Sequence, residues 1–392
     1  MRPIGPCHRR ADRRATTATI LFLACGGAAI LFFSDNDRLQ TLQSRSLAED
    51  SSAAVNGRHL KNKGHTIVAT VQEISMPTPS PTSEVAKRLP GPYLKLRYTG
   101  GRIGNDLFSL ASGYGIAAKY GYNFCINTLS LDVIDKLPHA PSGFSIHRIE
   151  RYFKGPFTFC DKHWKVKSRP IRAGHHINNF DQRDLSKYDG DDLEVSDFMQ
   201  SYGNFRHVKD EVLAMLTFNE EYVKKAAAVL EPFRRDGDII VGIHARRGDK
   251  IDCSYCDAPG DDYYVKAIER MREELGSLVS SGRPRIKFLL ASEGSEGYRW
   301  FNDHTREGGM FASDEFQYVG SSDPMLDLAV LSSCDHIVAS GGTFSWWAAF
   351  LGPTQKGGIV IHSNRLWAGA YENPTEWIPI VDSSRAAALK IK

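Results

Sequence analysis

The chain has 392 residues, of which 42% are hydrophobic and 24% charged, and its formal net charge is +3. This length and ordinary globular composition allow two domains with sizeable cores, and they exclude a chain that is disordered throughout. The nearly neutral charge also argues against a general nucleic-acid binder, because such proteins carry a pronounced basic excess.

The first predicted element is a membrane anchor. Residues 15–33 (ATTATILFLACGGAAILFF) carry no charge and follow the arginine-rich residues 1–14. About 17–25 apolar residues cross a bilayer, and the positive-inside rule then places residues 1–14 in the cytosol. We expect an uncleaved signal anchor of a single-pass type II protein, with a cleaved signal peptide as the alternative.

Residues 34–90 form the next predicted segment, a flexible stem. They contain the run MPTPSPTSE, and Pro/Ser/Thr-rich composition is typical of an extended linker. Five of the seven cysteines follow the anchor and are expected in a lumen where disulfides persist. They are Cys125, Cys160, Cys253, Cys256 and Cys334. Cys253 and Cys256 could form a disulfide or provide two of the four ligands of a zinc site. We favour the disulfide, because no second pair of zinc ligands is evident.

The segment 91–235 begins as a β-loop-α-β unit. We expect a strand at 93–97, a helix from an Asn105 cap to Tyr120, and a strand at 123–126. The segment 236–392 alternates buried strands with helices, which indicates a second parallel α/β domain. Its expected strands are 238–245, 285–292, 336–340 and 358–362, and its expected helices are 262–279, 323–334 and 343–351.

Polar residues that suit a phosphate ligand follow the buried strand at 238–245. Ligands of open α/β sheets bind beyond the carboxyl ends of the strands, and that position holds His244, Arg246, Arg247 and Asp249. Two guanidinium groups suit a diphosphate, whose oxygens they match in geometry and charge. The alternatives are a solvated basic turn and, because Arg-Gly-Asp is an adhesion tripeptide, a cell-surface adhesion module.

Two glycine-rich turns precede helices. In the run SGGTFSWW, Gly342 permits close approach of a ligand to the helix N-terminus, and Thr343 and Ser345 add hydroxyls. Trp346 and Trp347 are expected in the core. The second of these turns lies in the run GGRIGN, and we call it the first-half turn. It is a candidate for lining a ligand site, and the alternative is a tight turn with no ligand. The candidates there are Gly101, Arg102, Gly104 and Asn105.

Two Asp-x-Asp sequences resemble the metal motif of other transferases. They are the segments 189–191 and 236–238, and both precede expected strands. A metal-binding motif of this kind is expected after a strand. We therefore interpret both as loops.

Four motifs carry a resemblance to a known family. GRIGNDLFSLASGYGIAAKYG, MQSYGNFRHV, VGIHARRGD and DLAVLSSCDHIVASGGTFSWWAAFLG occur in this order across residues 93–362. They resemble the α-1,2-fucosyltransferases of glycosyltransferase family 11. The resemblance implies a GT-B-like fold of two Rossmann-like domains facing a cleft, an acceptor-side domain (91–235) and a GDP-fucose-binding domain (236–392).

The resemblance also implies an inverting transfer of L-fucose from GDP-β-L-fucose to the 2-hydroxyl of a terminal β-galactoside in the Golgi, without a metal or other cofactor. Arg246 and Arg247 would hold the diphosphate, and His244 would position the nucleotide or the fucose. Gly342, Thr343 and Ser345 would lie near the phosphates. The first-half turn would line the cleft.

The chain departs from the family at Asp106, where an amide is common after Asn105. An inverting transfer needs a base for the acceptor hydroxyl, and the candidates are Asp249 and Asp106. Asp249 has an equally strong alternative role in orienting Arg246. Two competing functions remain, which are a fucosyltransferase of another linkage or acceptor and an inactive lumenal glycan-binding or adhesion protein.

Overall fold

The computed structural model divides the chain into Met1–Pro79 and Ser80–Lys392, and only residues of the second unit are described. The expected anchor at 15–33, Gly101, Asp249, Cys253 and Cys256 lie outside the described residues. No helix within the described part is long and apolar enough to span a bilayer. The described residues are 89–97, 102–127, 146–160, 169–171, 188, 190–196, 198–234, 237–247, 258–279, 284–363 and 373–381.

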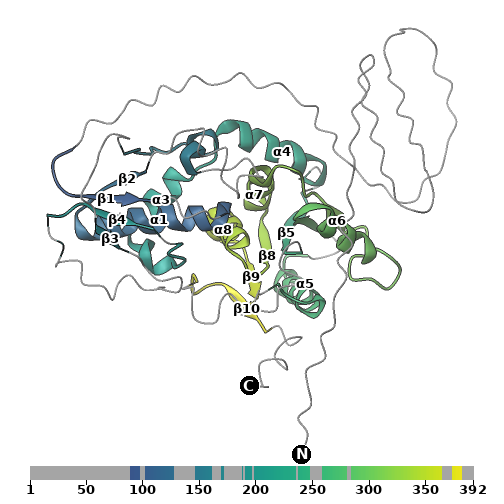
Figure 1. Ribbon diagram of the computed structural model, residues 1–392. Helices are drawn as coiled ribbons and strands as arrows, with labels where there is room; N and C mark the ends of the chain where they lie inside the picture. Colours follow the sequence, from purple (N-terminus) through teal and green to yellow (C-terminus); the bar gives the residue numbers. More distant parts are fainter. Residues whose placement is uncertain are drawn as a thin grey trace, which may run out of the picture. The chain divides into compact units, whose positions relative to one another are not determined.

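A first sheet is formed by four parallel strands in the order β2-β1-β4-β3 (Figure 1). Helix α1 (Ile103–Tyr120) connects β1 to β2 and ends at Gly121, whose φ of 74° favours glycine. The strands are β1 (Tyr93–Leu96), β2 (Asn123–Ile126), β3 (Arg169–Ile171) and β4 (Leu193–Val195). The β-α-β start predicted from the sequence is confirmed.

The beginning of α1 differs from the prediction. We expected Asn105 to cap the helix, but Arg102 occupies the N-cap position and makes no side-chain cap hydrogen bond. The backbone N–H groups of Asn105 and Asp106 donate to the carbonyl of Arg102, at 2.8 and 3.0 Å. The helix therefore starts three residues earlier, and the Asn105 side chain is available for another contact.

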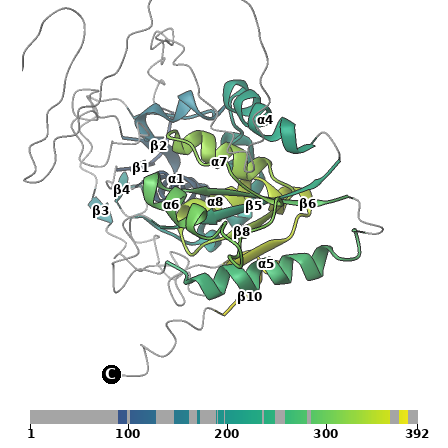
Figure 2. The ribbon, with the colours of Figure 1, turned by 90° about the vertical axis from the view of Figure 1, so that its right-hand side faces the viewer.

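A second sheet has six parallel strands in the order β10-β9-β8-β5-β6-β7 (Figures 1 and 2). The predicted strands and helices of this half are present, apart from shifted ends, and α6, β7 and β10 were not predicted. The strands are β5 (Ile239–Ala245), β6 (Ile286–Ser292), β7 (Phe316–Tyr318), β8 (His336–Ala339), β9 (Val360–Ser363) and β10 (Ile378–Ile380). The helices of this half are α5 (Asp261–Leu275), α6 (Gly294–Asp303), α7 (Pro324–Ser333) and α8 (Thr343–Leu351).

The two faces of the second sheet pack against different helices. Val241 and Ile243 of β5 lie in a core with α5, whereas Ile240 lies in a core that includes α1, α7 and α8. Alternate residues of a strand point to opposite faces, so a strand covered on both sides is a continuous apolar run. The parallel α/β class predicted from these runs is confirmed.

The shared core of both sheets is aromatic. Trp346 and Trp347 of α8 are buried, as predicted, and contact Phe108 of α1 with ring centroids 4.6 and 5.2 Å apart. Phe205, between helix η4 (Tyr202–Asn204) and helix η5 (Arg206–Val208), stacks on Trp347 at 5.7 Å. Aromatic pairs of this geometry add to the area that they bury. They hold α8 against α1.

The remaining helices and cysteines complete the description. Helix η1 spans Ile146–Arg151, helix α3 spans Lys209–Met215, helix α4 spans Glu220–Arg234 and helix η6 spans Pro353–Lys356. Cys125 and Cys160 form a disulfide, and Cys334 is free and buried.

Candidate functional site

The predicted site residues gather where strands of the second sheet end. Arg246 and Arg247 follow β5, Glu293 follows β6, and the turn before α8 follows β8. Carboxyl ends of parallel strands share one edge of a sheet, where ligands of α/β proteins bind. Helix α8 begins at this edge, and its N-terminus contacts the N-terminus of α1 from the first sheet (Figure 1).

The contact between α1 and α8 is made at Gly104. A Cβ atom added to Gly104 would lie 2.6 Å from backbone atoms of Thr343 and Phe344, so only glycine fits. The indole Nε1 of Trp347 donates to the Gly104 carbonyl at 3.1 Å. The first and fourth motifs of the sequence are thereby joined at one place.

Asn105 links the same two motifs through its side chain. Its Oδ1 accepts hydrogen bonds from Thr343 Oγ1 at 2.9 Å and from Gln200 Nε2 at 2.7 Å. Gln200 belongs to the second motif, MQSYGNFRHV. An amide oxygen with two lone pairs can satisfy both donors. The Asn105 side chain therefore connects the N-terminus of α1 to the N-terminus of α8 and to Gln200.

Arg102 and Arg246 converge on one carboxylate. Arg102 Nη1 lies 2.9 Å and Arg246 Nη1 lies 3.0 Å from the same oxygen, Glu293 Oε1. The side chains of Arg102, Glu293 and Arg246 are 53%, 34% and 13% exposed. One arginine comes from each sheet, so an anion placed between them contacts both halves of the fold. Sequence reasoning missed Glu293, because it stands in a polar run with no distinctive spacing.

Arg247 makes different contacts from its neighbour. Its Nη2 lies 2.9 Å from Asp261 Oδ1, and its guanidinium carbon lies 3.8 Å from the ring centroid of Trp300. Asp261 also accepts from Trp300 Nε1 at 3.0 Å. We expected both arginines to hold one diphosphate, but the structure pairs them with separate carboxylates. Both residues follow the end of β5, and their guanidinium groups lie against carboxylates of different elements.

Arg247→Ala is expected to destabilise the fold by roughly 1–2 kcal/mol, the range of a partly desolvated cation–π contact. The substitution removes the stack on Trp300 and the ion pair with Asp261. Arg247→Lys should recover little, because an ammonium group lacks the planar face. Urea unfolding of the three chains measures the effect, and equal midpoints would contradict this role.

His244 is a buried, neutral imidazole. It is 4% exposed, and its Nδ1 lies 2.8 Å from Ser340 Oγ. Burial, with a smaller effect of Arg246, lowers the pKa of His244 to about 3. Its ring lies against Phe344, with centroids 4.8 Å apart. At neutral pH, His244 is therefore an uncharged hydrogen-bonding group at the carboxyl end of β5.

Ser345 and Gly342 have different environments. Ser345 is fully buried, and its hydroxyl donates to the carbonyls of Ser340 and Gly342, at 2.6 and 3.0 Å. We expected a phosphate contact for Ser345, but its hydroxyl instead shapes the turn. By contrast, no atom of the described residues lies within 4 Å of a Cβ built on Gly342. Gly342 thus faces open space beside the N-terminus of α8.

Asp106 is a poor candidate for the base. It is 2% exposed, and burial raises its pKa well above the ordinary value. Its Oδ2 has no hydrogen-bond partner in the part of the chain that is described. A general base must come within hydrogen-bond distance of the acceptor hydroxyl, which this burial prevents. The other candidate, Asp249, lies outside the described residues.

Asp238, from one of the two Asp-x-Asp sequences, is an ion-pair partner of Arg285, with Oδ2 and Nη2 2.8 Å apart. It precedes β5, as expected of a loop residue. Within the described residues, no three His, Cys, Asp or Glu side chains are grouped as a metal site would require.

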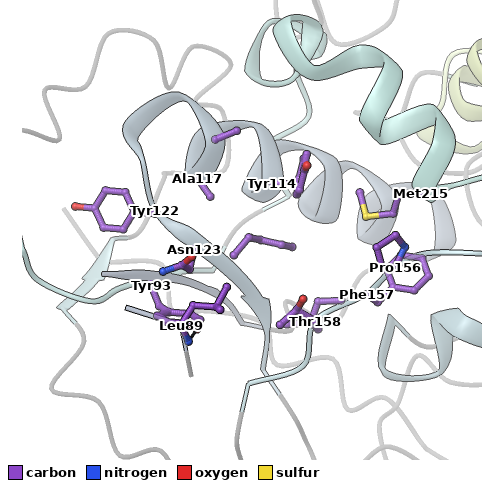
Figure 3. A pocket seen from close by; sticks show the side chains of 13 residues that line it. Leu89, Tyr93, Tyr114, Ala117, Tyr122, Asn123, Pro156, Phe157, Thr158 and Met215 are labelled. Atoms are coloured by element: carbon purple, nitrogen blue, oxygen red, sulfur yellow. Dashed lines mark hydrogen bonds between the residues drawn. The ribbon is translucent and has the colours of Figure 1, made fainter. Parts of the chain in front are cut away.

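A cavity of about 420 Å³ lies elsewhere, between α1 and β2 (Figure 3). Tyr114 and Ala117 of α1, Asn123 at the start of β2 and Met215 of α3 line it. None of the predicted site residues contributes to it. We therefore keep the candidate site at the edge of the second sheet.

Comparison with known proteins gives three findings. The family described as Glycosyl transferase family 11 matches residues 155–377. Galactoside alpha-(1,2)-fucosyltransferase 1 of Leontopithecus chrysomelas is 30% identical over 168 residues, which are 41% of this chain and 43% of the relative. Galactoside alpha-(1,2)-fucosyltransferase 2 of Gorilla gorilla gorilla is 24% identical over 258 residues, 64% of this chain and 67% of the relative.

The alignment with the first relative thus spans less than half of that relative's length. Among solved structures, fucosyltransferase NodZ from Bradyrhizobium superposes with a TM-score of 0.41 at 13% identity, covering 67% of this chain and 94% of that chain.

Proposed function

Since the chain belongs to glycosyl transferase family 11, we propose that it transfers L-fucose from GDP-β-L-fucose to the 2-hydroxyl of a terminal β-galactoside on a glycan. The names of both relatives, galactoside alpha-(1,2)-fucosyltransferases, support this donor sugar and linkage. The family match covers β5 with the two arginines that follow it, and it also covers α8.

The observation that carries the proposal is the convergence of Arg102 and Arg246 on one anionic oxygen. In this structure the oxygen belongs to Glu293. A phosphate oxygen of GDP-fucose has the same charge sign and the same preference for guanidinium donors. Gly342 leaves space next to the N-terminus of α8, where free N–H groups favour a second phosphate oxygen.

The proposed reaction is a direct displacement with inversion at the fucose anomeric carbon. As the bond to the diphosphate breaks, negative charge develops on GDP, and fixed donors that await this charge lower the barrier. Arg246 and Arg102 supply such donors. Neutral His244 precedes Arg246 by two residues and is the proposed positioning group for the nucleotide or the fucose. These cations support a reaction without a divalent metal.

Asp249 is the proposed base for the acceptor hydroxyl, because it follows the arginine pair in the same motif. Arg247 takes a positioning role in this scheme, since Asp261 and Trp300 hold it. It would fix the backbone from which Arg246 extends.

We also propose a single-pass type II location in the Golgi membrane, with the catalytic part in the lumen. The uncharged run 15–33 supports the anchor. The Cys125–Cys160 disulfide supports an oxidising compartment. Protease protection of sealed microsomes tests the orientation.

The function is tested by incubating the full chain, in detergent, with a panel of GDP-sugars and β-galactosides in the presence of a chelator. The expected result is transfer from GDP-fucose alone and a fucose α-1,2-linked to galactose. A product with another linkage would contradict the proposed transfer to the 2-hydroxyl of galactose. Failure to bind GDP would refute the donor, and binding of glycan without turnover would favour a lectin-like protein.

A further inference from the structure

Glu293 occupies the place between the two arginines where the proposed function puts a phosphate. It lies directly after β6 and precedes α6 as its N-cap residue, with no side-chain cap hydrogen bond there. Its Oε1 instead accepts from Arg102 and Arg246 at the same time. One carboxylate thus neutralises cationic groups from both sheets.

The pairing is weak enough for a phosphate to replace it. The side chains of Arg102 and Glu293 are half and one third exposed, and ion pairs that are this exposed contribute little to stability. A nucleoside diphosphate carries more negative charge than one carboxylate, and arginine binds it by two parallel hydrogen bonds. Because the Glu293 side chain is one third exposed, it can move into solvent when a phosphate displaces it.

Two anions cannot occupy this position together. When GDP leaves, Arg102 and Arg246 lose the anion between them, and the repulsion between two neighbouring cations raises the free energy of the empty site. Glu293 returns to them and lowers that free energy. The carboxylate therefore lowers the affinity of the site for the nucleotide.

We propose that Glu293 is a positioning residue that competes with the diphosphate for Arg102 and Arg246. It holds both guanidinium groups in place while the site is empty, and it speeds the departure of GDP after transfer. This inference rests on the proposed function, because it requires a diphosphate at the two arginines.

Glu293→Gln is the direct test. The amide oxygen still accepts hydrogen bonds from both arginines, but the negative charge is gone. We expect GDP to bind about tenfold more tightly, a typical coupling between two ligands of one region. KM for GDP-fucose should fall, and kcat should fall as well, because product release limits turnover in many enzymes. GDP affinity is measured by calorimetry and by product inhibition at low and high salt.

Two variants serve as controls. Glu296→Gln removes the same charge from the first turn of α6, where Glu296 is exposed, and should leave both constants unchanged. Glu293→Asp keeps the charge and should restore most of the wild-type GDP affinity. A purely structural role of Glu293 predicts the opposite result for the Gln variant, namely weaker GDP binding together with easier unfolding.

The inference is overturned if Glu293→Gln binds GDP no more tightly than the wild type, while the wild type binds GDP and transfers fucose. That outcome leaves the proposed function intact. If the wild-type chain itself does not bind GDP, the proposed function and the inference both fail. Unfolding temperatures of all variants separate these cases from misfolding.

Discussion

Replacement of Arg246 by alanine is expected to lower kcat by about 10²–10³-fold, the usual cost of removing one charge-stabilising donor. Arg246 is the least exposed of the three charged groups in the cluster and directs its Nη1 to the anionic position. The variant should remain folded, because Glu293 keeps its contact with Arg102. Initial rates with saturating GDP-fucose, together with thermal unfolding, measure both effects.

Arg299→Ala is the matched control for this substitution. Arg299 is an exposed residue of α6, so its loss changes the net charge equally without touching the cluster. Arg246→Lys should give an intermediate rate, since lysine keeps the charge but not the two-pronged geometry. Retention of near-wild-type turnover in Arg246→Ala would remove Arg246 from the mechanism.

Gly104→Ala is expected to produce the largest loss of stability. The new methyl group would lie 2.6 Å from the backbone N of Phe344 and from Thr343. Backbone atoms of a helix cannot move aside as the end of a side chain can, so α1 and α8 must separate. Overpacking of this kind costs roughly 1–3 kcal/mol or more. The contacts of Trp347 with Gly104 and of Thr343 with Asn105 would be strained as well.

Gly342→Ala provides the comparison, because the same atom added there meets open space. Its φ of −163° is extended backbone that alanine also adopts. Gly342→Ala should unfold near the wild-type temperature, whereas Gly104→Ala should unfold well below it. Equal unfolding temperatures for the two variants would show that α1 and α8 do not meet closely at Gly104.

The sequence alone determined the element order of the second half of the chain. Strands covered on both faces are continuous apolar runs, so β5, β6 and β8 were recognisable, as was α8 between glycines. Burial of Trp346 and Trp347 followed from their place at a helix start. The paired motifs also indicated the family, which the match over residues 155–377 shows.

Elements without a long pattern were missed. β7 and β10 have three residues each, which is too short for alternation to be visible. The polar run that begins α6 resembles a loop, although its later residues pack on the second core through Phe301. The predicted Asn105 cap was wrong. Asparagine is favoured at an N-cap, but the tertiary contacts of Asn105 with Thr343 and Gln200 outweighed that preference.

The tertiary structure alone decided which charged groups meet. The sequence places Arg246 and Arg247 side by side, yet they contact Glu293 and Asp261, respectively. Arg102 is distant in sequence from both Arg246 and Glu293 and reaches the latter only because α1 packs on α8. Periodicity reports how a segment folds locally, and it carries no information about which distant side chains the packing brings together.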